Sequence, residues 1–288
     1  MIDIRRTFLC TQVNFRKWMI NPRIYVVFTL TIAFLAYHSF GLSQFSAEVG
    51  YPVSPWIFAH LTTPPVMQVF AFLIILLFCD APFKDRHTPF LIVRTGRGNW
   101  IIGQIFYIFI AAFIYTLFSF LSSIVIMIPN VEMTFEWGIL LQTLANDPMY
   151  APDSVTIFFN PEWMAILSPI EATLLSLLHF WFVAIFIGLV ILSFNLLADK
   201  MLGILISGIF VFLSFFSVYI GTLLFGIGIY YFSPISWMSL SYVDWSYSGS
   251  FPSPTFALVT LLIAMIIMSI VSILIFIQKD IDIQSRRY

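Results

Sequence analysis

The stretch TFALVTLLIAMIIMSIVSILIFI, residues 255–277, carries no charge and is long enough to cross a lipid bilayer as one α-helix. A bilayer core takes about 20 mostly apolar residues per helix, with a usual range of about 17–25. Five further apolar stretches qualify, the second with some extension outward: 24–40, 65–79, 100–128, 172–197 and 201–231. We therefore expect an all-α integral membrane protein with six transmembrane helices in a single domain, residues 1–288.

The overall composition excludes a soluble globular domain. The 288 residues are 60% hydrophobic and 9% charged, whereas soluble domains have about 25% charged residues. The net charge of −1 predicts no nucleic-acid partner. The partner that the composition does predict is the lipid bilayer.

The positions of the charges predict which loops share a side of the membrane. The 13 basic residues fall into groups separated by segments that carry only acids. Lys and Arg collect in cytoplasmic loops, while Asp and Glu contribute little to orientation. Both termini are then cytoplasmic, which agrees with an even number of spans. The basic residues are Arg5, Arg6, Arg16, Lys17, Arg23, Lys84, Arg86, Arg94, Arg97, Lys200, Lys279, Arg286 and Arg287.

Two polar segments, 129–168 and 232–254, are expected outside the cell. The first should be an ordered loop with turns and one or two short helices. At its end Ser168, Pro169 and Glu171 suit an N-cap, a first-turn proline and a capping-box carboxylate, which predicts the start of the fourth span. The second segment is rich in aromatic residues, which suit the outer headgroup level and short re-entrant helices.

Residues 1–22 predict a helix that lies in the membrane interface. At 100° per residue one narrow arc is mostly apolar, and the basic residues lie elsewhere on the wheel. The alternative is a simple cytoplasmic tail. The residues of the arc are Ile4, Phe8, Thr11, Phe15, Trp18 and Met19.

The cytoplasmic loop 80–99 is too elaborate for a simple turn. Thr88 suits an N-cap and Gly96 a left-handed end, so a short helix is expected over residues 89–95. Asp80 should pair with an arginine of the loop, because an unpaired carboxylate at the end of a span is costly. A short helix with mixed apolar and basic surface suits a protein dock or the membrane interface, and the cations also set the topology.

The loop resembles a known family of membrane proteins. The strings Asp80-Ala-Pro-Phe83, Thr88-Pro-Phe90 and Arg94-Thr-Gly-Arg97, followed by Trp100, are similar to the cytoplasmic loop of bacterial type-2 ABC transporter permeases, particularly those of Gram-positive organisms. The six spans, the interfacial helix and the aromatic outer segment are also similar to that family. The outer loop 129–168 is longer than in many members.

This resemblance implies a coupling helix at residues 89–95 that docks on a separate ATPase subunit. It implies Arg86, Arg94 and Arg97 as electrostatic partners of the ATPase and Phe83 or Phe90 as anchors, with Asp80, Gly96 and Trp100 shaping the loop. It also implies ATP and Mg²⁺ bound by the ATPase, a second or related permease copy, and a place in the bacterial plasma membrane. No cofactor is expected in this chain.

Other classes of function fit the residues less well. The chain has no phosphate-binding loop and no His-Glu-x-x-His motif, and its four histidines lie in different segments, so an enzyme is not expected. The buried polar candidates are Gln104, His179 and Asn195, and this charge-poor interior favours an amphipathic or hydrophobic cargo such as a peptide, a lipid or a drug-like molecule. The alternative is a stand-alone carrier, or an immunity or sensor protein that binds a membrane-active peptide.

Overall fold

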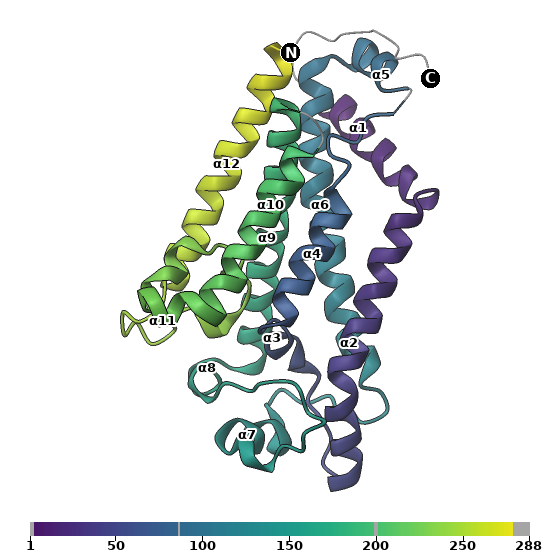
Figure 1. Cartoon of the computed structure of the whole chain (residues 1–288). Coiled ribbons are helices and arrows are strands. Elements are labelled where there is room, and N and C mark those ends of the chain that lie inside the picture. The colour runs from purple at the N-terminus through teal and green to yellow at the C-terminus, as the bar shows by residue number, and fades with distance from the viewer. Residues whose placement is uncertain (1–2, 86, 199–200, 279–288) are drawn as a thin grey trace.

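The computed structural model describes residues 3–85, 87–198 and 201–278 as an elongated helical bundle (Figure 1). In this part of the chain, five helices are long and apolar enough to cross a membrane. At a rise of 1.5 Å per residue each is longer than the roughly 30 Å of a hydrocarbon core. The five are α2 (Pro22–Val49), α6 (Arg97–Ile126), α9 (Pro169–Leu197), the stretch Leu202–Phe225, and α12 (Pro254–Gln278).

The sixth candidate span is broken. α4 (Val66–Phe78) has 13 residues, which gives about 20 Å of helix. It follows the short pair Pro55–Ile57 and α3 (Phe58–Leu61), and the two parts meet at 87°. Pro64 and Pro65 at the joint lack backbone N–H groups and cannot continue an α-helix from the preceding turn. The described residues therefore contain five candidate spans, or six if the bent pair counts as one.

The stretch after α9 also departs from a uniform helix. α10 (Leu202–Phe216) continues through a π-helical turn (Ser217–Gly221) into α11 (Thr222–Phe225). Gly226 then adopts a φ of 70°, and a 3₁₀ helix (Ile227–Phe232) follows. The predicted fifth span, 201–231, thus contains an α-helical part that ends at Phe225 and an irregular part that leads into the outer segment.

α9 is the central helix of the bundle. It packs against α4, α6, α10 and α12, and 67% of its most apolar window is buried, compared with 17% for α12. Its start confirms the predicted capping box, because the Ser168 side chain accepts from the Glu171 N–H and the Glu171 carboxylate accepts from the Ser168 N–H. At Gly188 a side chain would meet Ile108 and Phe78. The glycine therefore lets α4 and α6 approach α9 closely.

The N-terminal helix α1 (Ile4–Arg16) lies against the first half of α6. Its buried face is polar or small: the Thr11 hydroxyl donates to the Gly103 carbonyl at 3.0 Å, and the Asn14 amide donates to Gln104 at 2.7 Å. Ile4 and Phe8 are exposed. The apolar arc therefore divides, since Ile4 and Phe8 face outward while Thr11 faces α6.

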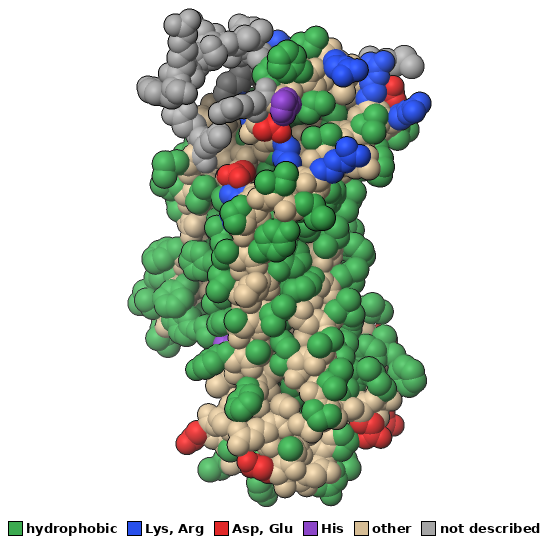
Figure 2. Space-filling model, turned by 90° about the vertical axis from the view of Figure 1, so that its right-hand side faces the viewer, with side chains coloured by type: hydrophobic (Ala, Val, Ile, Leu, Met, Phe, Trp, Pro, Cys, Tyr) green, Lys and Arg blue, Asp and Glu red, His purple; other side chains and the backbone are tan. Residues whose placement is uncertain are grey.

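The two ends of the bundle differ in charge. Figure 2 shows a wide apolar band between an end where Lys and Arg gather and an end where the coloured charges are Asp and Glu. α1 and α5 (Thr88–Thr95) lie at the basic end, and α7 (Gly138–Asn146) and α8 (Pro161–Ile166) lie at the other (Figure 1). The expectation of one or two short helices within 129–168 is confirmed by α7 and α8. We call these ends the basic end and the acidic end.

Candidate docking surface and outer pocket

The predicted short helix in the basic loop is present as α5, Thr88–Thr95. Its predicted cap is wrong, because the Thr88 hydroxyl donates to the Asp85 carboxylate at 3.0 Å and accepts from the Asp85 N–H at 2.8 Å, and no side chain caps the helix. The prediction that Gly96 ends the helix in the left-handed conformation is also wrong in part. Its φ of 85° is positive, but its ψ of 150° is extended. This turn directs the chain straight into α6.

α5 presents an apolar and basic face outward. Phe90 and Val93 are 71% and 84% exposed, and Arg94 beside them is exposed as well. Ile92 on the opposite side is buried. Large apolar side chains of this exposure on a rigid helix are typical of protein contacts or membrane contacts. We call Phe90, Val93 and Arg94 the docking surface.

Phe83, predicted as an anchor for a partner, lies inside the loop. Its ring is half-buried and packs 4.7 Å from the Tyr107 ring of α6. Its carbonyl accepts from the Lys17 ammonium at 2.8 Å, and the same ammonium lies 2.9 Å from the Asp85 carboxylate. Lys17 therefore ties the end of α1 to the loop before α5.

The ion pair at Asp85 has an electrostatic consequence. Partial burial raises the pKa of Asp85, but the Lys17 ammonium and the hydrogen bond from Thr88 outweigh this effect and leave the pKa below its ordinary value. The carboxylate is thus held in its charged form. The contact remains partly open to water, so its contribution to stability is small.

Arg97 and Trp100 join the loop to the last helix. The Arg97 guanidinium donates to the Ile277 carbonyl at 3.0 Å. The buried Trp100 ring stacks on the Phe276 ring, with centroids 4.7 Å apart. Of the arginines predicted to meet a partner, Arg94 is the one on the exposed face of α5. Arg97 points to α12, and Arg86 lies outside the described residues.

The start of the loop is tied to three more helices. Asp80 forms an ion pair with Arg23 of α2, which lies outside the loop. The Asn195 amide of α9 donates to the Ala81 carbonyl at 2.8 Å and accepts from the Gly203 N–H of α10 at the same distance. The docking surface therefore belongs to a loop that contacts helices throughout the bundle.

A buried polar group lies where the broken span bends. His60 of α3 is fully buried among aromatic rings, and its ring stacks on the Trp163 ring of α8 at 4.5 Å. In the described part of the chain neither of its ring nitrogens has a hydrogen-bond partner, and the same holds for the side chain of Gln68. Thr62 contacts Ser176 of α9 at 3.4 Å. These contacts connect the bend to α8 and α9.

His179, one of the buried polar candidates, forms a hydrogen bond within its own helix. Its Nδ1 lies 2.8 Å from the Leu175 carbonyl one turn earlier in α9. Groups of three or more His, Cys, Asp or Glu that suit a metal ion are absent from residues 3–85, 87–198 and 201–278.

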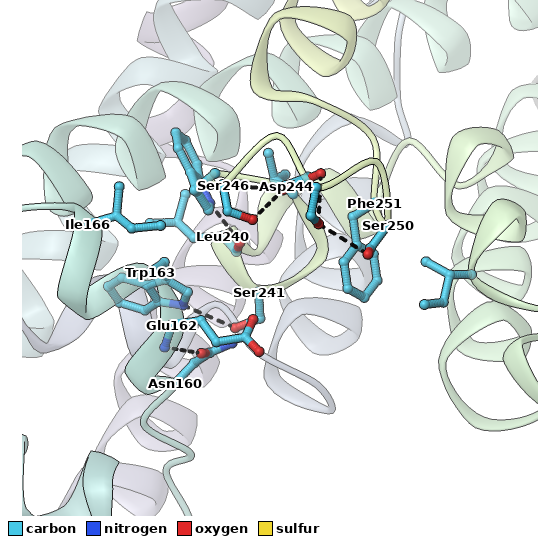
Figure 3. Close-up of a pocket in the computed structure, with 14 residues that line it drawn as sticks. Asn160, Glu162, Trp163, Ile166, Leu240, Ser241, Asp244, Ser246, Ser250 and Phe251 are labelled. Carbon is cyan, nitrogen blue, oxygen red and sulfur yellow. Dashed lines mark hydrogen bonds between the residues drawn. The ribbon is translucent and has the colours of Figure 1, made fainter.

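The acidic end holds a pocket that the sequence did not predict. A cavity of about 540 Å³ lies between α8 and residues 240–251, a size typical of small-molecule pockets. In Figure 3, Asn160, Glu162 and Trp163 lie on one side and Asp244, Ser246 and Phe251 on the other. The clustered aromatic and serine residues of 232–254 could have indicated one wall of this pocket. The wall formed by α8 becomes visible only in the fold.

Two carboxylates line this pocket in different ways. Asp244 accepts from the Gly249 N–H at 2.6 Å and from the Ser246 hydroxyl at 3.0 Å. Burial raises the pKa of Asp244, but these hydrogen bonds and those from Ser248 outweigh it and lower the pKa below its ordinary value. Asp244 therefore shapes the loop. Glu162 is exposed in the first turn of α8, which Asn160 caps.

Comparisons with protein-family models, with curated proteins and with solved structures gave no match for this chain. The proposed function therefore rests on the helical bundle, the docking surface and the outer pocket.

Proposed function

We propose that this chain is the membrane-spanning permease subunit of an ATP-binding-cassette exporter. The observation that carries the proposal is the docking surface: a short helix with Phe90, Val93 and Arg94 exposed, on a loop tied to α1, α2, α6 and α9. The start of α6, directly after the loop, contacts α12. A force applied to α5 would reach these helices directly. The similarity of this loop to the coupling loop of type-2 ABC permeases supports the same function.

In this proposal the basic end faces the cytoplasm, because Lys and Arg collect on that side of a membrane. Both termini are then cytoplasmic and the acidic end faces outward from a bacterial plasma membrane. Two ATPase subunits bind ATP and Mg²⁺ beneath a pair of permease copies, identical or related. Their closure moves α5 and thereby tilts the spans, which moves an amphipathic or hydrophobic cargo across the membrane.

The direct test is purification of the native complex in a mild detergent. The proposal predicts an ATPase subunit that copurifies with the chain and restores transport when it is added back. Absence of any ATPase, together with function in its absence, would refute it.

Arg94→Gln probes the docking surface within that complex. Exposed charge contacts contribute up to about 1 kcal/mol, so transport driven by ATP should fall by at most about fivefold, with membrane insertion unchanged. Arg16→Gln is the matched control, because Arg16 is an exposed cation of the basic end that lies on α1. Equal effects of the two substitutions would remove Arg94 from the docking surface.

One observation favours the alternative of a stand-alone carrier, or of an immunity or sensor protein. The outer pocket at the acidic end lies between α8 and residues 240–251. A surface receptor for a peptide would need a pocket of this kind. Such a protein would function without an ATPase. Copurification therefore separates the two functions.

A further inference from the structure

The charge at the acidic end restricts what the outer pocket binds. Of the described residues that line the pocket, none is a Lys or an Arg, and Glu162 and Asp244 are both acidic. The polar segments of this end carry acids only, from Glu132 to Glu171 and again at Asp244. A cleft lined by one sign of charge raises the local concentration of the opposite ion. An anionic ligand is therefore disfavoured.

The walls of the pocket add an apolar requirement. Trp245 and Phe251 are half-buried, so part of each ring faces the cavity that they line, and Ile166 and Ile227 are exposed beside them. Aromatic faces attract cations as well as apolar groups. A small inorganic cation would leave these rings unused. The ligand therefore combines a positive charge with an apolar group.

Glu162 and Asp244 have unequal parts in such binding. The Asp244 carboxylate already accepts from Gly249, Ser246 and Ser248, so its oxygens are occupied by hydrogen bonds from its own loop. The Glu162 carboxylate is exposed at the pocket, and its backbone N–H bonds to Asn160. Glu162 is the carboxylate that is available to a ligand.

We propose that the outer pocket binds an amphipathic organic cation, with Glu162 contacting its ammonium or guanidinium group and Trp245 and Phe251 contacting its apolar part. The inference is independent of the proposed exporter function, because an outward-facing pocket would contact the departing cargo of an exporter or the external ligand of a sensor. The volume of about 540 Å³ accommodates a small amine or the side chains of a short basic peptide.

Trp163 connects the pocket to the bent span. It lines the cavity, its indole N–H donates to Ser241 at 3.3 Å, and its ring stacks on His60 of α3. α3 leads through the bend into α4, and α4 leads into the loop that carries α5. A ligand that displaces Trp163 would therefore act on the chain segment that ends at the docking surface.

The test is a binding titration of the purified full chain in nanodiscs of neutral phosphatidylcholine. The probes are the N-acetylated peptide amide Arg-Phe-Arg, its neutral N-acetylated citrulline analogue, N-acetylated Arg-Ala-Arg amide, and phenethylamine as the small-amine probe. We expect the Arg-Phe-Arg peptide to bind most tightly of the three peptides. Its affinity should fall as the salt concentration is raised. Binding by phenethylamine alone assigns the pocket to small amines, and binding by the peptide alone assigns it to basic peptides; both outcomes support the proposal.

Glu162→Gln should weaken binding of the charged probe by about fivefold, the effect of about 1 kcal/mol for an exposed ionic contact. Glu132→Gln is the matched control, because it removes the same charge from the same end without lining the pocket. Equal effects of the two substitutions, equal binding of the citrulline analogue, or no binding of any charged probe would each overturn the proposal.

Discussion

Gly103→Ala should release α1 from α6. A Cβ at this position would lie 2.6 Å from the Cys10 Cβ and 3.0 Å from the Thr7 carbonyl oxygen. Both distances are shorter than ordinary contacts, and the second atom belongs to the backbone, which has no rotamer to change. The helix must therefore move away from α6 as a unit.

The movement would strain three hydrogen bonds that hold α1. Thr11 bonds to the Gly103 carbonyl at 3.0 Å, Asn14 to Gln104 at 2.7 Å, and the Trp18 indole to the Tyr107 hydroxyl at 2.6 Å. Each contributes about 0.5–1.5 kcal/mol net. If the helix retreats far enough to lose two of them, docking weakens by about 1–3 kcal/mol, which is a factor of about 5 to 150.

Cys10 provides the assay. It is 3% exposed, and burial raises the pKa of its thiol, so a maleimide reacts with it slowly while α1 is docked. In a Cys79→Ala background, Gly103→Ala should accelerate labelling of Cys10 by about 5- to 150-fold. Gly98→Ala is the control, since a Cβ there meets nothing within 4 Å. Equal labelling rates for the two variants would refute the proposed contact.

Two further outcomes follow from the structure. Gly188→Ala should destabilise the protein by about 1–3 kcal/mol in thermal unfolding, because its Cβ would lie 2.6 Å from Ile108; Gly208→Ala, with open space around it, should not, and similar losses for both would contradict the packing of α9. The pKa of Asp85 is lowered from 3.8 in the fold, so its pairing with Lys17 stabilises the protein above that pH and is lost as pH falls through the lower native pKa. The difference in unfolding midpoint between wild type and Asp85→Asn should accordingly vanish in strong acid, and a difference that persists there would exclude the ion pair as its source.

The sequence predicted most of the bundle because apolar length depends on local composition. The start of α9 was also local, since Ser168 and Glu171 are three residues apart. The break between α3 and α4 was not predicted, although Pro64 and Pro65 mark it. The predicted stretch 65–79 corresponds to α4, and the break lies in its outward extension, between α3 and α4.

The site could be predicted only in part. α5 was found from its turn residues, but the orientation of Arg97 depends on Ile277, 180 positions further along the chain. Phe83 turned inward because Tyr107 and Lys17 lie beside it in the fold. The outer pocket brings Glu162 together with Phe251, which belong to two different segments of the chain. The spacing of residues within one segment cannot predict a contact with another segment.

The most direct test of the central claim is photocrosslinking from α5 in the native membrane. Benzoylphenylalanine replaces Phe90 in one sample and Phe135 in the other; the two side chains are 71% and 77% exposed, and they belong to the basic loop and to the outer segment. The account predicts a crosslink from position 90 to an ATPase subunit and none from position 135. Crosslinks from position 90 to lipid alone, or to the same protein from both positions, would contradict it.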